Sequence, residues 1–569
     1  MSPALFQTTL YASLALCALG LMWRISAWFR VQIGRDVREL TLSQRMTAAF
    51  RGAVLAPFGW QASRLARAFF LDVLLQWRLF AVAKLRWLGH FLIVIGFMWL
   101  LLMHAFAAAV TEKLFPGYQP TLNPYLFLRD LGGVMVLIGV ALLLFGQWRR
   151  NSDFPPRRRL IEWAFVALLG FVLVSGFLLA ADKIASPRTF YRMADQYIGS
   201  TDAEKLKPLR AFWRSEFGVA FDDLKVPIDP GLAETGRKLH VDSCASCHAK
   251  PGSAFVSYSV AKVLAPMTGL LDTARAEAWL LYLHVFACFV GLATLPFTRF
   301  FHVVAAPIAL LVNGAAPNHA FSTAARATRR ALALDACVRC GVCDLNCSVA
   351  PQARFLGNPG LLPSHKLIAT GALVSGRLLR AGHEDDALRA ADGAFLCTDC
   401  GRCTSQCPVG LDLADLWDAG RSDLAAAGLP GTAQWMQARP ALAWTELLER
   451  GAGQHTVADP DSALAPLSSD ARTFSRCVQC QTCTNVCPVV AHSIDTDHGV
   501  DLTPQKVMNL LRMGQRDLAL GSRMVWDCAT CYQCQEHCPE GIRVTDIMCE
   551  LRTLAVNRLG PVRNWRAPS

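Results

Sequence analysis

The chain has 569 residues, of which 53% are hydrophobic and only 18% are charged, and its mean hydropathy is +0.30. These values exclude an ordinary soluble globular protein and favour a chain with several membrane segments. The net charge of +12 does not indicate nucleic-acid binding, because many lysines and arginines stand next to apolar runs. Eighteen of the 21 cysteines fall into five regular motifs, which favours cofactors over a disulfide framework.

Five stretches are long and apolar enough to cross a bilayer, which takes about 20 helical residues. They are Leu5–Met22, Leu88–Val110, Leu131–Trp148, Leu160–Ala181 and Ala276–Leu295. The first has neither a charged leader nor a clear cleavage site, so we expect a retained span. Residues 24–86 and 149–159 are strongly basic, and basic loops stay on the cytoplasmic side of a bacterial inner membrane. The sequence therefore predicts a periplasmic N-terminus, a periplasmic segment 182–275, and cytoplasmic residues after the fifth span.

A short amphipathic run, FFLDVLLQWRLF, lies in the basic loop between residues 56 and 84. It is too short to cross the bilayer. An interfacial helix and a packed cytoplasmic helix are both compatible with this run.

Four histidines lie in or near the predicted spans, where polar side chains are costly and usually functional. His90 and His104 are about 21 Å apart along a helix axis, and His284 and His302 are about 27 Å apart. Each pair would lie on one helix face, with one member near each membrane surface. Because the second and fifth spans run in opposite directions, His90 comes level with His302, and His104 with His284. The pattern predicts two bis-histidine b haems; histidines that only hydrogen-bond within a bundle are the alternative.

Five spans with these histidine pairs resemble the gamma subunit of respiratory nitrate reductase. The stretch FHVVAAPIALL (301–311) is similar to that family's haem ligand at the cytoplasmic end. The resemblance implies two b haems and quinone exchange at a membrane surface. The histidine spacing in the second span and the long segment before the fifth span depart from the family, so its quinone-site residues do not transfer.

The stretch GLAETGRKLHVDSCASCHAKPG (231–252) contains C-x-x-C-H, the attachment sequence of c-type haem. It resembles the first helix and haem loop of small cytochromes c. The resemblance assigns Cys244 and Cys247 to the thioether bonds and His248 to the proximal iron ligand. A zinc-binding or redox-active C-x-x-C is the alternative.

The sixth ligand of this haem is less constrained, because only about two dozen residues separate the loop from the fifth span, fewer than a small cytochrome c uses. Met267, in LAPMTG, is the favoured ligand. Met193 and His240 remain open as alternatives, and His240 is otherwise a helix residue.

After about residue 315 the chain carries four runs with the spacing C-x2-C-x2-C-x3-C. They are CVRCGVCDLNC (337–347), CTDCGRCTSQCP (397–408), CVQCQTCTNVCP (477–488) and CATCYQCQEHCP (528–539). Three closely spaced thiolates can bind three corners of a cubane, but the loop is too tight for the fourth, which reaches the neighbouring cluster. Zinc sites use separate C-x2-C knuckles instead.

The runs therefore work in pairs, and each predicted [4Fe–4S] cluster takes three cysteines of one run and the fourth of the other. The four ligand sets are Cys337, Cys340, Cys343 and Cys407; Cys397, Cys400, Cys403 and Cys347; Cys477, Cys480, Cys483 and Cys538; and Cys528, Cys531, Cys534 and Cys487. The helical spacers resemble the dicluster ferredoxin domain of heterodisulfide reductase C-type subunits, here in two copies. The polar linker 450–470 is a plausible boundary between the copies.

We therefore predict a mainly α fold: a five-helix transmembrane haem bundle, a small periplasmic cytochrome c-like insert and two cytoplasmic α-helical 2[4Fe–4S] ferredoxin domains. The predicted boundaries are 1–181 for the first four spans, 182–275 for the insert, 276–314 for the fifth span, and 315–450 and 451–569 for the two ferredoxin domains.

No Gly-rich phosphate loop, Cys-Cys pair or nucleophile–base arrangement stands out in the sequence. We predict an electron-transfer subunit that connects a cytoplasmic catalytic redox partner to the quinone pool, to a periplasmic acceptor, or to both. A quinone-independent wire to a periplasmic cytochrome is the alternative, and a self-contained disulfide or sulfur-compound reductase is disfavoured. The chain as a whole resembles membrane subunits of heterodisulfide-reductase-like and dissimilatory sulfite-reduction-associated complexes.

Overall fold

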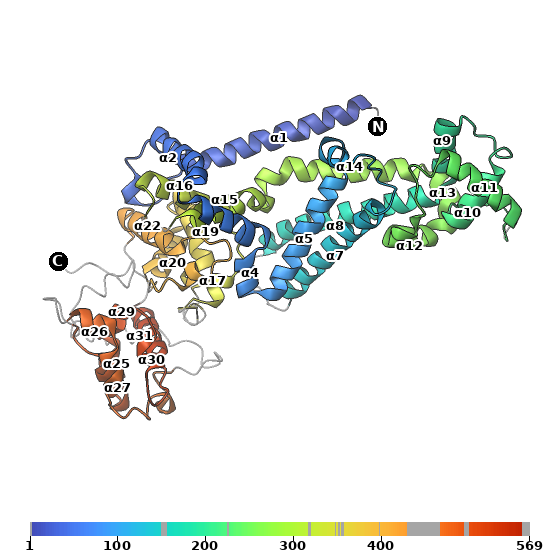
Figure 1. Cartoon of the computed structure of the whole chain (residues 1–569). Coiled ribbons are helices and arrows are strands. Elements are labelled where there is room, and N and C mark those ends of the chain that lie inside the picture. The colour runs from blue at the N-terminus through green and yellow to red at the C-terminus, as the bar shows by residue number, and fades with distance from the viewer. Residues whose placement is uncertain are drawn as a thin grey trace. The chain divides into compact units, whose positions relative to one another are not determined.

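The computed structural model describes most of the chain, which divides into two compact units. The described residues are 3–148, 156–224, 227–316, 320–347, 349–350, 353, 358–395, 397, 399–429, 467–493 and 500–559. They are mainly helical, and no strand occurs among them (Figure 1). The first unit comprises Met1–Met22 and Leu75–Phe300, and the second comprises Trp23–Leu74 and Phe301–Ser569. The predicted linker 450–470 and the basic link 149–159 lie largely outside the described residues.

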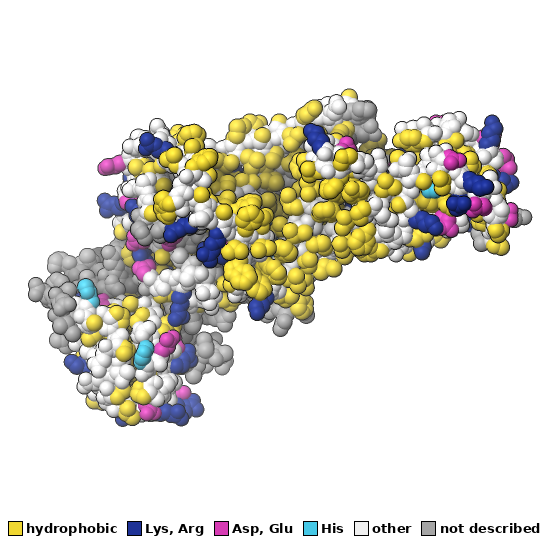
Figure 2. Space-filling view, in the orientation of Figure 1, with side chains coloured by type: hydrophobic (Ala, Val, Ile, Leu, Met, Phe, Trp, Pro, Cys, Tyr) yellow, Lys and Arg dark blue, Asp and Glu magenta, His cyan; other side chains and the backbone are white. Residues whose placement is uncertain are grey.

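Five helices are long and apolar enough to cross a membrane. They are α1 (Pro3–Arg30), α5 (Lys84–Met103), α7 (Tyr125–Trp148), α8 (Pro156–Ala185) and α14 (Ala276–Thr294). Figure 2 shows apolar side chains gathered on the surface over α5, α7 and α8, as helices that face lipid require. Four of the predicted stretches are helical over nearly their whole length. The second, Leu88–Val110, is not: α5 ends at Met103, His104 follows at φ −122° and ψ −76°, and the chain continues in a π-helix, η4 (Ala107–Thr111). His104 therefore lies just beyond the helix that carries His90.

Helices α5 and α7 pack closely because glycines line their contact. A methyl group on Gly96 would lie 2.6 Å from the carbonyl oxygen of Gly132, and one on Gly139 would lie 2.5 Å from that of Gly89. Small residues let helix backbones approach in lipid, where burial of apolar surface contributes little to association. This contact fixes α5, which carries His90.

The fifth span differs from its prediction. Helix α14 is followed by two short 3-10 turns, and α15 (His302–Ala315) begins a new helix. Pro296 has no amide hydrogen to donate and Thr298 is extended, with φ −123° and ψ −178°, so the helical hydrogen bonds stop here. His284 and His302 therefore do not lie on one face of one continuous helix, and the spacing argument for that pair is wrong.

Residues 182–275 fold into a group of short helices. They are α9 (Pro187–Ile198), α10 (Lys207–Glu216), α11 (Pro230–Ser243), α12 (Phe255–Leu264) and α13 (Thr268–Thr273). Helices α10 and α11 touch at Gly236, where a methyl group would lie 1.9 Å from the carbonyl oxygen of Pro208. The core of this segment is aromatic and contains Phe190, Phe212, Trp213, Phe217 and Phe221, together with Cys244.

In the second unit, the basic segment after α1 packs against the first of two cysteine-rich domains, residues 323–429. Arg330 on α16 (Thr323–Ala336) is 5% exposed. Its guanidinium donates to the Asp36 carboxylate and the Asp415 carboxylate, both at 2.7 Å, and to the carbonyl of Ile33 at 3.0 Å. The predicted basic loop is thus packed against this domain and is bonded to it through Arg330.

The amphipathic run is not one helix. It is divided between a π-helix, η3 (Ala68–Leu74), and α4 (Trp77–Val82), with Gln76 in the left-handed region at φ 53°. Ala68 packs against Gly314 of α15, where an added methyl group would lie 2.7 Å from the Ala68 side chain. Phe69 and Phe70, in contrast, are exposed. One side of η3 is therefore packed against protein, and the other is an open apolar surface.

Each cysteine run encloses a four-residue helix, and longer helices separate the runs. The four short helices are α17 (Val342–Leu345), α21 (Arg402–Ser405), α25 (Thr482–Asn485) and α30 (Gln533–Glu536). The longer ones are α19 (Pro363–Val374), α20 (Glu384–Phe395) and α22 (Leu413–Ala426) in the first cysteine-rich domain, and α27 (Pro504–Arg512), α28 (Arg516–Leu520), α29 (Arg523–Asp527) and α31 (Val544–Leu559) in the second, residues 467–559. The repeated short helix indicates that the two domains hold their cysteines in the same way.

Arg330→Gln should loosen the attachment of the basic segment, because it leaves the carboxylates of Asp36 and Asp415 without their shared buried cation. We expect a loss of about 2 kcal/mol in local stability. Hydrogen exchange of peptides covering residues 31–45, measured on the purified full-length protein, should become faster.

Arg38→Gln is the matched control. Its ion pair with Asp423 is half exposed on the arginine side, and such pairs contribute at most about 1 kcal/mol. Unchanged exchange in Arg330→Gln would contradict the role given to this cation.

Candidate iron–sulfur and haem sites

The cysteines of the four runs form four groups, which we number by their predicted ligand sets. Site 1 is Cys337, Cys340, Cys343 and Cys407; site 2 is Cys347, Cys397, Cys400 and Cys403; site 3 is Cys477, Cys480, Cys483 and Cys538; and site 4 is Cys487, Cys528, Cys531 and Cys534. All sixteen lie in described residues.

Every run bends its backbone in the same way. The residues directly before and after the second cysteine are left-handed in all four runs, with φ between 48° and 73°. They are Arg339 and Gly341, Asp399 and Gly401, Gln479 and Gln481, and Thr530 and Tyr532. Turns of this kind direct backbone amides into a concave nest that favours anions, including iron–sulfur clusters. The loops therefore have the conformation that an anionic cluster needs.

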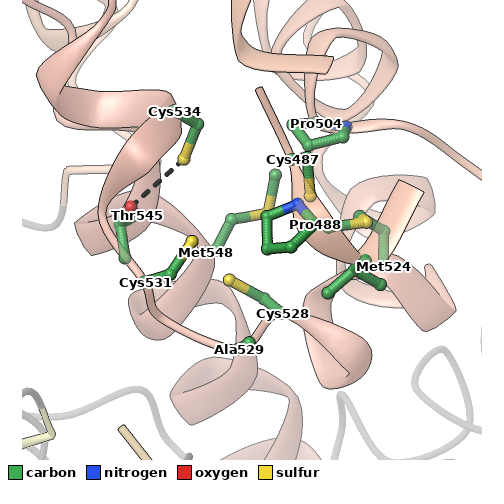
Figure 3. A pocket seen from close by; sticks show the side chains of 11 residues that line it. Cys487, Pro488, Pro504, Met524, Cys528, Ala529, Cys531, Cys534, Thr545 and Met548 are labelled. Atoms are coloured by element: carbon green, nitrogen blue, oxygen red, sulfur yellow. Dashed lines mark hydrogen bonds between the residues drawn. The ribbon is translucent and has the colours of Figure 1, made fainter. Parts of the chain in front are cut away.

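Site 4 surrounds a pocket (Figure 3). Its four cysteines line this pocket together with apolar side chains, among them Met524 and Met548. Cys487 comes from the third run and the other three cysteines from the fourth, which is the crossed arrangement expected from the spacing. The hydroxyl of Thr545 lies 3.2 Å from the sulfur of Cys534.

Site 3 surrounds a second pocket of the same kind. Cys477, Cys480, Cys483 and Cys538 line it, and the last of these again comes from the other run. The side-chain amide of Gln479 donates to the sulfur of Cys477 at 3.3 Å. Hydrogen bonds to ligand sulfurs are one of the features that set a cluster's reduction potential.

Sites 1 and 2 show the same crossing in their electrostatics. Burial raises the pKa of Cys337 to about 12, and the thiols of Cys407 and Cys340 contribute. Burial raises the pKa of Cys347 to about 11; Lys366 lowers it, and the thiols of Cys397 and Cys400 raise it. The last cysteine of each run thus lies near the thiols of the other run.

The residues present fit iron–sulfur clusters better than single ions. In the described part of the chain, no group of three or more Cys, His, Asp or Glu side chains converges as around one metal ion. At sites 3 and 4 the four cysteines line a pocket instead, as ligands at the corners of a cubane must. Burial keeps these thiols protonated, whereas iron binds the deprotonated thiolate. Loading each site with a cluster therefore releases protons.

Lys366 on α19 is a feature of site 2 that the sequence did not reveal. Its side chain is only 4% exposed, and it lies near enough to Cys347 and Cys403 to lower the pKa of both thiols against the effect of burial. A buried cation next to a cluster favours its reduced, more negative state. No motif marks this lysine, which lies in an apolar helical spacer.

The C-x-x-C-H loop follows α11 and is tied to the segment before α7. Cys244 is 5% exposed and belongs to the aromatic core, and the ring of His248 lies 5.5 Å from that of Trp213. The hydroxyl of Thr121 donates to the carbonyl of Cys247. The amide of Ala249 in turn donates to the carbonyl of Thr121 at 3.0 Å.

Two residues near Thr121 in the sequence bond to neighbouring elements rather than to the loop itself, and we call Tyr118, Thr121 and Asp130 the haem-loop clamp. The hydroxyl of Tyr118 donates to the carbonyl of Met103 at 2.9 Å. The buried carboxylate of Asp130, on α7, accepts from the amides of Val256 and Ser257 at 2.8 and 2.9 Å at the start of α12. No sequence motif marks these three residues, because only their position beside the second and third spans distinguishes them.

The three candidates for the sixth haem ligand have different surroundings. Met193 packs against the aromatic core that includes Cys244. His240 is buried between the rings of Phe212 and Phe217, and its Nδ1 has no hydrogen-bond partner. Met267, the favoured residue from the sequence, is 50% exposed and is not part of that core.

Two of the histidines predicted to bind b haems have a hydrogen-bond partner at Nδ1 of the ring. His104 Nδ1 lies 3.0 Å from the carbonyl of Leu100, and His284 Nδ1 lies 3.0 Å from the hydroxyl of Ser175 on α8. These two histidines are close enough to interact electrostatically. A hydrogen bond at Nδ1 orients a ring for metal binding through Nε2.

The other predicted pair is divided between the units. His90 belongs to the first unit, and its Nδ1 lies 2.8 Å from Oε1 of Gln76. His302 is the first residue of α15, in the second unit. Whether His90 and His302 share one haem stays a prediction.

Fold and sites together define a protein with two iron–sulfur domains, each built for two [4Fe–4S] clusters. A family model for the 4Fe-4S dicluster domain matches residues 333–411 and 473–542, which are the two cysteine-rich domains. This match confirms the tandem dicluster prediction. The chain is thus an iron–sulfur electron-transfer protein.

Curated relatives agree with this class. The chain is 39% identical over 82 residues to the C subunit of the ferredoxin:CoB-CoM heterodisulfide reductase of Methanosarcina mazei, covering 14% of this chain and 46% of that protein. It is 33% identical over 82 residues to the iron-sulfur C subunit of the CoB–CoM heterodisulfide reductase of Methanopyrus kandleri, covering 14% and 39%. The C2 subunit of the H2/formate:CoB-CoM heterodisulfide,ferredoxin reductase of Methanococcus maripaludis is 32% identical over 93 residues, covering 16% and 46%.

The chain spans about half the length, or less, of these curated relatives. No solved structure matches it significantly. The matched stretches are 82 to 93 residues long, or 14 to 16% of this chain.

Cys407→Ser should remove the cluster of site 1, although Cys407 lies in the second run, because this cysteine completes the ligand set of the first. Electron paramagnetic resonance spectra of the reduced full-length protein should match those of Cys340→Ser. Cys400→Ser, which affects site 2, is the control. A Cys407→Ser spectrum that instead matches Cys400→Ser would mean that each run holds its own cluster.

Proposed function

We propose that this protein is a membrane-bound electron-transfer subunit that connects a cytoplasmic redox partner to the quinone pool and to a periplasmic acceptor. The observation that carries the proposal is the combination, in one chain, of two dicluster domains with five helices long enough to cross a membrane. When bound, the clusters and haems supply one-electron chemistry, and the protein supplies ligands, spacing and surroundings.

The positions of the basic segments along the chain support opposite compartments for the two kinds of site. The basic segment 23–74 and both cysteine-rich domains belong to the second unit, and basic segments favour the cytoplasmic side. Residues 182–275, with the C-x-x-C-H loop, follow the basic link 149–159 across one long apolar helix, α8. In our proposal the clusters therefore lie in the reducing cytoplasm, and the c haem lies in the oxidising periplasm, where it is attached.

The haem-loop clamp supports an electron exit on the periplasmic side. Tyr118 is bonded to the carbonyl of Met103, the residue before His104, and Thr121 is bonded to the carbonyl of Cys247, the residue before His248. The segment 118–121 thus forms hydrogen bonds directly before His104, a proposed b-haem ligand, and directly before His248, the proposed c-haem ligand. We infer that His104 and His284 hold the periplasmic b haem; His90 and His302 stay the ligands predicted from the sequence for the cytoplasmic one.

The partner on the cytoplasmic side is a catalytic redox subunit in this proposal. The relatives that match are C subunits of heterodisulfide reductases, and such names imply a separate catalytic component. Quinone exchange at a membrane surface rests on the resemblance of the five-span part to the nitrate reductase gamma family. Quinone-independent transfer to a periplasmic cytochrome is the second candidate, which the haem-loop clamp favours.

Cofactor analysis of the purified full-length protein tests the proposal directly. We expect about sixteen iron atoms in clusters and about three haems, one of which resists acid–acetone extraction because it is covalently bound. A quinone-analogue inhibitor that shifts the b-haem spectrum would support the quinone branch, and insensitivity would favour the direct wire. A preparation with clusters and no haem would overturn the membrane part of the proposal.

Histidine variants test the haem assignments. His104→Ala and His284→Ala should each remove the same b haem, and His302→Ala should remove the other, while cluster iron stays near the wild-type content. Haem content and low-temperature difference spectra measure both outcomes. Unchanged haem content in His302→Ala would refute that ligand.

Thr121→Val should loosen the C-x-x-C-H loop, because it removes the hydrogen bond to the carbonyl of Cys247. Hydrogen exchange of residues 245–250 should rise about fivefold, as expected for the loss of one buried hydrogen bond of about 1 kcal/mol. Ser246→Ala, which removes an exposed hydroxyl of the same loop, is the control and should leave this exchange unchanged.

A further inference from the structure

A direct contact joins the two cysteine-rich domains. The guanidinium carbon of Arg402 lies 4.2 Å from the centre of the Tyr532 ring, within the range of a cation–π interaction. Arg402 stands between Cys400 and Cys403 of site 2, and Tyr532 stands between Cys531 and Cys534 of site 4. The contact is therefore made by the cluster-binding loops themselves.

Tyr532 is held in a position that favours this contact. It occupies the left-handed site after the second cysteine of its run, at φ 65°, where the first and second runs have glycine. Its hydroxyl donates to the carboxylate of Asp546 on α31 at 3.1 Å. A large aromatic residue is uncommon in this conformation, so the ring orientation is fixed both by the backbone and by a hydrogen bond.

An apolar contact between the domains also involves site 2 of the first domain. One hydrophobic core contains residues of the second domain together with residues of the first. From the first domain these are Cys347, Val349, Ala353, Leu361, Leu362 and Phe395. From the second domain the core includes ligands of site 4 (Cys487, Cys528 and Cys534) and of site 3 (Cys477, Cys483 and Cys538), so it locates the first-domain side of the contact at site 2, while the Arg402–Tyr532 contact locates the second-domain side at site 4. The first-domain residues flank or include Cys347 and Cys397 of site 2, and in the described residues this core holds no ligand of site 1.

Cys549 on α31 is a further buried thiol that interacts electrostatically with ligands of the same two sites. It is buried, and burial raises the pKa of its thiol. Cys528 of site 4 and Cys400 of site 2 raise it further, while Arg552 lowers it. A single side chain is therefore close to ligands of both sites.

We propose that sites 2 and 4 form the junction between the domains, so that the four clusters are arranged in the order 1–2–4–3 rather than in sequence order. This inference rests on the proposed function, which fills the sites with clusters. Within each domain the crossed cysteines join site 1 to site 2 and site 3 to site 4. Sites 1 and 3 are then the two ends of the wire.

The surroundings of the two end sites assign their partners. Cys337 of site 1 caps α16, which packs along α15, the helix that begins with His302. At site 3, Cys480 is exposed, as is Cys531 of site 4, and Val478 beside Cys477 is 61% exposed. Site 1 is thus the end linked through two helices to a proposed haem ligand. In the proposed order this leaves site 3 as the end toward the cytoplasmic redox partner.

Two double variants of the full-length protein test the order. Cys340→Ser with Cys480→Ser removes sites 1 and 3 and leaves sites 2 and 4, whereas Cys400→Ser with Cys531→Ser leaves sites 1 and 3. Each should retain about eight cluster iron atoms. After full reduction, electron paramagnetic resonance should show magnetic coupling between the two remaining clusters in the first variant and two uncoupled signals in the second.

Coupling in the second variant, or uncoupled signals in both, would overturn the order while leaving the proposed function intact. Absence of clusters from the wild-type protein would instead refute the proposed function. The two failures are therefore distinguishable.

Single variants provide a measurement that does not depend on removing clusters. Tyr532→Ala should raise hydrogen exchange of residues 399–404 in the other domain about fivefold, because it removes the cation–π contact. Gln481→Ala is the matched control, since Gln481 occupies the equivalent left-handed position at site 3. Equal exchange of residues 399–404 in Tyr532→Ala and wild type would contradict the junction.

Discussion

The short spacing of the cysteine runs is the constraint on which the cluster-binding part depends. A loop that presents three thiols to one cluster cannot bring its fourth thiol to the same place. Cys407 therefore lies near the thiols of the first run, and Cys487 lines the pocket of the fourth. The helices between the runs bring two loops face to face. A dicluster domain is thus the smallest unit in which all four cysteines of each run can bind a cluster.

The same logic extends beyond one domain. Left-handed residues shape each loop, and where glycine is absent the side chain at that position becomes available for other contacts. Tyr532 uses this position to meet Arg402. Lys366 places a buried positive charge next to site 2, which in the proposed order lies in the interior of the wire. The loops thus determine both how clusters are held and how the domains meet.

The sequence predicted the parts whose chemistry depends on spacing. The tandem dicluster domains and the five long helices are confirmed, because cysteine spacing and apolar length are direct physical requirements. The break after α14 was missed, since a histidine spacing of five turns is meaningful only along an unbroken helix and Pro296 ends it. Arg330, Lys366 and the haem-loop clamp depend on contacts between residues distant in sequence, which no local pattern records.

The attachment of the C-x-x-C-H loop has a consequence for biogenesis. Cys244 is buried in the aromatic core, and the backbone around Cys247 is bonded to Thr121. A thiol in that position is closed to a maturation enzyme. If the proposed c haem is attached there, ligation has to precede final folding, and the nascent segment must stay open after translocation until the porphyrin completes its core.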